Sequence, residues 1–416
     1  WDGKPITLKP LVVLDDVHTL HPTQFISLFR LLARREIQIG RWMMTRVDAL
    51  TPQAVLGVED IEEHSGLTKG RDYIDIYMQN HGQDREKNRT RFRSLASDMA
   101  DRYLSRVQSL HERNHRRLGA LLSNDIGTIT PSRIRDLESQ LDKDQRRLSI
   151  TKNRRLKIEK MVSDFAKGTK SQDVFEDLQM AMVRILLHRY AVRVSEQELD
   201  LFEQADPEPR VPLKADNSVA DAARIYLHKN YGRPLHYGLE TVCDASNDNA
   251  ELFLNFAGEL VLVMENKAIT QKDPALSPAL QQTILKRKAN EIIDAWHFPY
   301  AQAVRLLIDS IALDCTVETH KPNAPLGPGA NAIAIDEEEI KTLENNDPAA
   351  RVLKFAVAYG AINVIRNYGQ GSKKWYLVEL SGLVCLGKGL TLKKGGFLKR
   401  SLEDISDIIE GEVKSE

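Results

Sequence analysis

The stretch LVVLDDVHTLHPTQFISLFRLLARREIQIGRWMMTRVDAL, residues 11–50, decides the fold. Residues 11–14 are a continuous apolar run that ends in two carboxylates, as expected for a strand buried on both faces of a parallel sheet. Residues 22–32 open with a proline and repeat apolar side chains at helical spacing. Residues 42–44 predict a second buried strand, which ends at Thr45. Strand, crossover helix and strand together predict a right-handed βαβ unit of an α/β sheet.

The composition limits the classes of protein that this chain can belong to. Its 416 residues suggest several domains, and 42% hydrophobic residues are enough to build cores. No apolar run of about 20 residues exists, so we expect no integral membrane protein. The net charge of −1 does not indicate nucleic-acid binding by the chain as a whole. Any such binding would have to come from local basic patches. Three well-separated cysteines and the lack of a signal peptide lead us to expect a cytoplasmic protein.

Beyond the first unit the character of the sequence changes. The side chains of residues 73–78 follow an alternating pattern that predicts another strand. Residues 80–160 then carry 20 Lys and Arg against 11 Asp and Glu. Two long helices are predicted there, over 91–122 and after Pro131, and the two could pair antiparallel. The acidic, proline-containing residues 196–221 predict a linker or an exposed loop.

Nearly the whole second half of the chain combines helices with a hairpin. Residues 219–315 give helical patterns, and a cluster of Pro and Gly at 322–329 marks the next break. Residues 349–359 predict a helix, and two β-runs around the glycine turn at 369–371 predict a hairpin. A helix beside a basic hairpin suggests a winged-helix module.

Residues 11–50 resemble the segment between Walker B and sensor one of AAA-type ATPases, and the whole chain is similar to bacterial ATPases grouped with origin-recognition initiators. Residues 233–238 and 245–254 are similar to the helical lid of that family. Residues 375–397 are similar to its C-terminal part, where the initiators carry a winged helix.

The resemblance implies ATP and Mg²⁺ as cofactors and a role for three residues. Asp15 would hold Mg²⁺ largely through the waters of the ion, and Asp16 would polarise the water that attacks the γ-phosphate. Thr45 would act as the sensor that orients this water. Most members carry Glu where this chain has Asp16, one methylene shorter. The alternatives stay open: a buried strand often ends in an acidic loop, and Thr45 could simply end a strand.

The phosphate-binding loop of the family is missing from the sequence. A GxxxxGK[ST] motif should precede Walker B, but only ten residues precede Leu11. Residues 382–388 are a near miss at the wrong end of the chain, where Gly389 replaces the Ser or Thr that binds Mg²⁺. The apolar interior of this string suits a packed turn better than an anion cradle. We therefore expect a fragment that begins before Walker B of a longer ATPase and that does not hydrolyse ATP by itself.

Together these patterns predict an α/β protein with a mostly α remainder. Its expected parts are a partial parallel P-loop ATPase sheet (residues 1–80), a long basic helical region (81–205), a helical lid-like region (206–320) and a winged-helix-like domain (321–416). The expected function is an AAA-type ATPase that couples nucleotide state to DNA or partner binding. Two alternatives are a non-enzymatic DNA-binding or scaffolding protein with a degenerate nucleotidase core, and a defence-type signalling ATPase.

For DNA, the strongest patch is the basic segment 373–400, which holds seven Lys and Arg against one acid, Glu379, with Trp375 and Tyr376 among them. Lysines on a hairpin neutralise phosphates without reading sequence. The alternative is that they only protect an exposed sheet edge from aggregation. The candidate DNA contacts are Lys373, Lys374, Lys393 and Lys394.

AAA-type assembly implies a homo-oligomer or an ATPase partner, in which an arginine reaches the neighbouring γ-phosphate. Arg71, Arg91 and Arg93 are candidates, although each could equally lie on a solvated helix face. His18 and His21 flank the end of the first strand, but the sequence places no third metal ligand beside them, which favours a polar loop.

Overall fold

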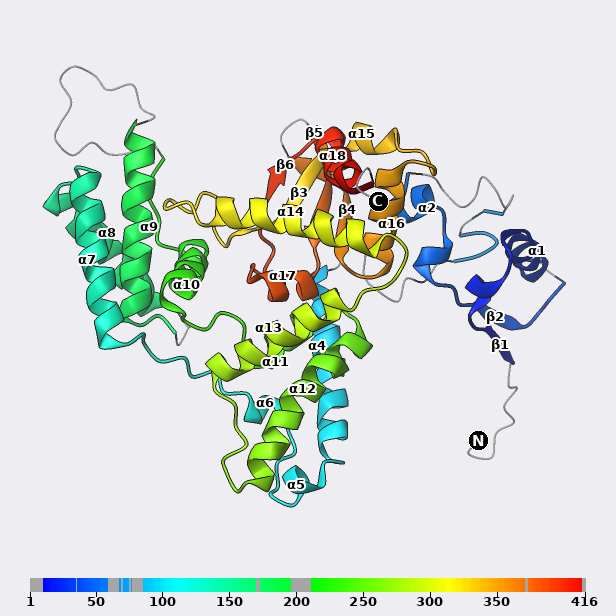
Figure 1. Ribbon diagram of the computed structural model, residues 1–416, viewed down its shortest axis with the longest axis horizontal. Coiled ribbons are helices and arrows are strands. Elements are labelled where there is room, and N and C mark those ends of the chain that lie inside the picture. Colours follow the sequence, from blue (N-terminus) through cyan, green and yellow to red (C-terminus); the bar gives the residue numbers. More distant parts are fainter. Residues whose placement is uncertain are drawn as a thin grey trace.

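The computed structural model in Figure 1 describes residues 10–34, 36–58, 67–68, 70–74, 76, 85–169, 173–195, 211–370 and 373–413. Within these ranges the chain is mostly helical and contains a two-stranded parallel sheet and a four-stranded mixed sheet. No helix in the described ranges is both long and apolar enough to cross a bilayer.

The predicted βαβ unit is present at the beginning of the described chain. It consists of β1 (Leu11–Leu14), α1 (Pro22–Leu32) and β2 (Gly40–Met43). The two strands pair in parallel, with Leu11 opposite Gly40 and Leu14 opposite Met43. The side chain of His21 accepts a hydrogen bond from Thr23 N–H, and Pro22 occupies the first turn, so the helix begins where the sequence predicts.

The expected burial of these strands on both faces is wrong for the described chain. Leu11 is 49% exposed, Val13 47% and Trp42 56%. Two strands and one crossover helix cannot cover both faces of a parallel sheet, because burial there requires neighbouring strands and helices on each side. In Figure 1 this unit lies apart from the other elements at one end of the molecule.

Helices make up the middle of the chain. In order they are α4 (Arg85–Leu104), α5 (Gln108–His111), α6 (Leu118–Leu121), α7 (Pro131–Arg147), α8 (Lys152–Gly168), α9 (Glu176–Ser195) and α10 (Asn217–Tyr231). Helices α7 and α8 each pack along α9, at the end of the molecule opposite β1 and β2. Their shared core contains Leu137, Ile158, Leu178, Met182 and Leu186.

The helix predicted over residues 91–122 ends at Leu104 and is followed by two short helices. Leu104, Leu110 and Leu118 are all buried in one core. On a straight helix Leu104 and Leu110 would point in directions about 120° apart, so the chain turns to bury both. The Asp101 carboxylate fixes the turn by accepting a hydrogen bond from Leu118 N–H at 2.9 Å.

Two predicted segments fall partly outside the described residues. Residues 75, 77 and 78 of the strand predicted over 73–78 lie there, as do residues 196–210 of the predicted linker. The end of that linker, from Asn217, is already the first turn of α10, capped by the Asp216 side chain.

Four further helices fill residues 238–319 and contain the helical patterns predicted there. They are α11 (Gly238–Ala245), α12 (Ala250–Ile269), α13 (Pro278–Asp294) and α14 (Ala301–Thr319). Their apolar faces join α4 and the C-terminal elements in one large core, to which Phe253, Phe256 and Leu307 contribute.

The C-terminal part surrounds the mixed sheet. Its elements are β3 (Ala330–Asp336), α15 (Glu337–Lys341), α16 (Pro348–Ala358), β4 (Ile362–Gln370), β5 (Lys373–Leu380), α17 (Gly382–Lys388), β6 (Gly396–Lys399) and α18 (Leu402–Val413). The strand order is β4-β5-β3-β6, in which β4 and β3 pair antiparallel with β5 and β6 pairs parallel with β3. The predicted helix at 349–359 and the hairpin after it are both present.

The near-miss phosphate motif at residues 382–388 is helix α17. Leu383 to Gly387 are buried, and Lys388 pairs with Asp309 at 2.5 Å. The string therefore belongs to the hydrophobic core and does not form an open loop.

Candidate functional site

Asp15, Asp16 and Thr45 lie together at the carboxyl edge of the parallel sheet. The two chain segments stay hydrogen-bonded past the strand ends, because Met44 N–H donates to the Leu14 carbonyl at 2.8 Å and Val17 N–H donates to the Met44 carbonyl at 3.2 Å. In a regular parallel ladder the donor to Met44 would be Asp16 N–H, so the pairing shifts by one residue here and Asp16 lies outside it. Ligands of open α/β sheets bind at this kind of edge. The three residues that the sequence singled out thus follow the carboxyl ends of two paired strands.

The backbone between the two aspartates is locally constrained. Asp16 adopts a left-handed conformation with φ 53°, and its N–H donates to Asp15 Oδ1 at 2.9 Å. The hydroxyl of Thr19 donates to the Asp16 carbonyl at 2.9 Å. The Asp15 carboxylate is therefore anchored to the chain, whereas the Asp16 side chain is 75% exposed. The Thr45 hydroxyl lies 3.5 Å from the Arg46 carbonyl and is exposed.

The donor set suits Mg²⁺ bound with a nucleotide. Magnesium in such sites keeps several waters and binds one or two carboxylates together with substrate phosphates. Among the residues that the structure describes, no group of three or more His, Cys, Asp or Glu side chains is arranged to hold a metal ion without such a ligand.

The two histidines beside this edge have other contacts. His21 Nδ1 lies 2.9 Å from the Thr23 hydroxyl at the start of α1, so this ring caps the helix. His18 Nδ1 lies 3.8 Å from Asp16 Oδ1, an ion pair only when the ring is protonated. The geometry supports the polar-loop interpretation of both residues.

The candidate arginine fingers are separated in the structure. Arg71 forms an ion pair with its neighbour Asp72 at 2.7 Å, and Arg91 is exposed on α4. Arg93 pairs with Asp244 and Glu240 on α11, at 2.7 and 2.8 Å. Arg93 is thus already held inside the chain.

The four lysines proposed for DNA contact do not form one patch. Lys373 begins β5 and pairs with Asp336 at 3.1 Å, next to the exposed Lys374. Lys394 lies over the Tyr368 ring, 5.3 Å from its centroid. Lys393 turns away from them and pairs with Asp221 of α10 at 2.7 Å. Lys373, Lys374 and Lys394 therefore remain on the hairpin side of the sheet, whereas Lys393 joins two parts of the chain.

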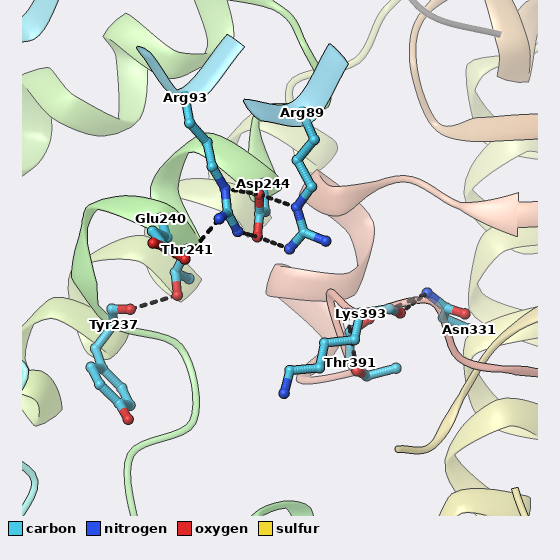
Figure 2. A network of polar contacts seen from close by, with 9 residues as sticks. All are labelled: Arg89, Arg93, Tyr237, Glu240, Thr241, Asp244, Asn331, Thr391 and Lys393. Carbon is cyan, nitrogen blue, oxygen red and sulfur yellow. Dashed lines mark hydrogen bonds and ion pairs between the residues drawn. The ribbon is translucent and has the colours of Figure 1, made fainter. Parts of the chain in front are cut away.

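Lys393 belongs to a cleft of about 1060 Å³ that the sequence did not predict. Figure 2 shows Arg89 and Arg93 extending from α4 onto Asp244, with Lys393 across the cleft. Arg89 Nε donates to Asp244 Oδ1 at 2.7 Å, and the Asp244 side chain is only 9% exposed. Thr391 and Lys393 present their carbonyls to the Asn331 amide, which shapes the loop.

The charges of this cleft are paired within the chain. On the α10 side Arg224 contacts Asp173 and Asp221, each at 2.6 Å. His236 lines the same cleft, and burial lowers the pKa of its ring to about 4. Because each of these arginines and Lys393 has a carboxylate partner, the cleft is an ion-paired junction between helices and not an open anion site.

One sequence signal could have revealed the junction. Arg89 and Arg93 are four residues apart, as are Glu240 and Asp244, so each pair lies on one face of its helix. Opposite charges at matching spacing on two helices indicate that the helices pack against each other. The spacing alone does not show which of the many acidic faces is the partner.

Comparison of the chain with protein-family models, with curated proteins and with solved structures gives no match in any of the three.

Proposed function

We propose that the chain carries the Walker B and sensor-one part of an AAA-type ATPase and couples a Mg²⁺-nucleotide to DNA binding. The observation that carries the proposal is the edge itself: Asp15 and Asp16 follow one parallel strand, and Thr45 follows its paired neighbour, so that all three come after the carboxyl ends of adjacent strands. A strand that merely ends in an acidic loop does not require a hydroxyl after the end of the next strand.

In this proposal each residue has one task. Asp15, held by the Asp16 amide, would bind Mg²⁺, which supplies charge neutralisation at the phosphates. The exposed carboxylate of Asp16 would orient and polarise the attacking water, and the Thr45 hydroxyl would help to place it. An origin-recognition-like ATPase core remains part of the proposal, as do a homo-oligomer or ATPase partner and a cytoplasmic location.

The order of the C-terminal elements supports a winged-helix module. Helix α14, β3, α15, α16 and the β4–β5 hairpin follow the winged-helix order of helix, strand, helix, helix, strand and strand. The sheet order β4-β5-β3 agrees with that arrangement, and β6 adds a parallel strand. In helix-turn-helix modules the helix at the position of α16 enters the major groove of DNA.

The nucleotide part is tested by equilibrium binding of a fluorescent ATP analogue, with and without Mg²⁺, to the protein as its native gene encodes it. Asp15→Asn is expected to weaken Mg²⁺-dependent binding about tenfold, because the metal loses a charged ligand. Asp98→Asn, an exposed aspartate on α4 paired with Arg102, is the control and should bind as the unmodified protein does. Equal Mg²⁺ dependence in the two variants would remove Asp15 from the site.

The DNA part is tested by the salt dependence of binding. With Lys373 and Lys374 both changed to Ala, the slope of log K against log salt concentration should become shallower by about 1 to 2 units, since each phosphate contact contributes about 0.9. Lys152→Ala with Lys157→Ala, two lysines of α8 at the far end of the molecule, is the matched control. A slope unaltered by the hairpin variant would exclude this patch.

A further inference from the structure

The residues that follow Thr45 are fastened to helix α16. Arg46 Nη2 donates to the Tyr359 hydroxyl at 2.9 Å, and that hydroxyl donates to Asp48 Oδ2 at 3.0 Å. Arg46 and Asp48 also pair directly at 3.0 Å. Tyr359 directly follows the last residue of α16, so three side chains join the nucleotide edge of the sheet to the end of this helix.

A short helix, α2 (Pro52–Leu56), continues this attachment. Gln53 N–H donates to Asn345 Oδ1 at 3.0 Å, and Asn345 Nδ2 donates back to Gln53 Oε1 at 2.6 Å. Leu56 is 1% exposed within the main core, and its carbonyl accepts from the Tyr376 hydroxyl at 3.1 Å. We call residues 46–58 the latch segment. Figure 1 shows α2 beside α16, between the βαβ unit and the mixed sheet.

The outward face of α16 is also covered from a second side. The ring of Phe298, from the loop between α13 and α14, stacks on Tyr359 with centroids 3.9 Å apart. Tyr300 from the same loop lies 5.6 Å from the Phe355 ring of α16. A helix must present a bare face to enter a major groove about 12 Å wide. With the latch segment in place, every residue of α16 after Pro348 is buried or half-buried.

We propose that the latch segment holds the winged-helix module closed, and that duplex DNA can engage α16 only after the latch segment detaches. This inference rests on the proposed function, because it takes duplex DNA as the partner and the Asp15, Asp16 and Thr45 edge as the nucleotide site. Thr45 and Arg46 are adjacent in the chain, so a ligand that moves Thr45 necessarily moves the first residue of the latch segment. A ligand that binds the detached form more tightly shifts the population toward it.

The contacts that hold the latch segment are individually weak. Helix α2 has five residues, too few to be stable without the surface that it covers. The Arg46 side chain is 54% exposed, so its ion pair with Asp48 is largely solvated. Of α2 only Pro52 and Leu56 are buried, with Val55 partly buried against the core, and most of the polar contacts are hydrogen bonds that water can replace.

Two single substitutions loosen the latch segment without touching the nucleotide edge or the hairpin lysines. Gln53→Ala removes the paired amides, and Tyr359→Phe removes the hydroxyl between Arg46 and Asp48 but keeps the ring that Phe298 stacks on. The matched controls are Gln108→Ala and Tyr103→Phe. Gln108 is an exposed glutamine of α5 whose amide donates to Glu112 at 2.8 Å, and Tyr103 is a tyrosine of α4 that is 51% exposed.

The measurement is binding of a random-sequence 30-base-pair duplex by fluorescence anisotropy, with amide hydrogen exchange of α16 as the second readout. Each loosened variant is expected to bind about fivefold more tightly, a typical size for a coupling between two sites, and to exchange its α16 amides faster. The two controls should match the unmodified chain in both readouts. The double variant Gln53→Ala with Tyr359→Phe should bind the duplex more tightly, and exchange its α16 amides faster, than either single variant.

Unchanged duplex affinity in the double variant overturns the latch, whether or not its α16 amides exchange faster. If the duplex is bound through Lys373 and Lys374 while the loosened variants match the controls, only the latch fails and the proposed function stands. If neither the unmodified chain nor any variant binds the duplex, the DNA part of the proposed function fails together with the latch. The Asp15→Asn binding test judges the nucleotide part separately.

Discussion

Replacing Asp16 with asparagine is expected to lower ATP hydrolysis at least about 100-fold while ATP binding survives, because a positioned carboxylate that accepts a proton contributes about 10² to 10⁴ in rate. The asparagine keeps the shape of the side chain and the left-handed backbone at this position, which Asn tolerates well. Only the charge and the basicity are lost. The measurement is steady-state phosphate release by the protein as its native gene encodes it, together with binding of a fluorescent ATP analogue.

Asp98→Asn serves again as the control, since this carboxylate is exposed on α4 and pairs with Arg102 four residues later. Its turnover should match that of the unmodified protein. If Asp16→Asn hydrolyses ATP at the rate of this control, Asp16 is only the end of a strand and the degenerate-core alternative becomes the better explanation.

The second large effect is expected at Asp244, the carboxylate on which Arg89 and Arg93 converge. Asp244→Asn leaves two guanidinium groups without their shared charge. Removing one partner of a fully buried pair costs about 3–5 kcal/mol, and because these arginines are 34% and 29% exposed we expect about 2 kcal/mol. The loss should appear as faster hydrogen exchange in α4 and α11, which this contact joins.

Glu240→Gln is the matched control, because Glu240 pairs with the same Arg93 but its side chain is 78% exposed. An exposed pair contributes about 0–1 kcal/mol, so this variant should change the exchange of α4 and α11 only slightly. Equal effects of the two substitutions would show that burial of Asp244 does not determine the strength of the junction.

The sequence predicted those parts of the fold whose signals are local. The parallel unit follows from an apolar run, a helical repeat and a second run within residues 11–50, and the hairpin follows from two β-runs around a glycine turn. The cleft could not be predicted in the same way, because Arg89 and Asp244 are 155 residues apart. The contacts of the latch segment join residues that are separated by 292 to 320 positions in the sequence. A periodic sequence pattern does not indicate such a contact.

Two errors of sequence interpretation have the same physical cause. The helix predicted over residues 91–122 breaks after Leu104 because the core must bury Leu104 and Leu110 together, and tertiary packing overrides a favourable local sequence. The strands β1 and β2 look like buried strands, but burial depends on neighbours that their own sequence does not specify.

The attachment of the latch segment also has a consequence for biosynthesis. Arg46 meets Tyr359 across 313 positions of sequence, so the contact has to wait until the ribosome has made the C-terminal part. At about 5–20 residues per second this interval lasts roughly 15 to 60 seconds. During that time Leu56, which is 1% exposed in the complete fold, is open to contact with other nascent chains. Slow translation of the residues between Arg46 and Tyr359 would lengthen this exposure and lower the yield of correctly assembled protein.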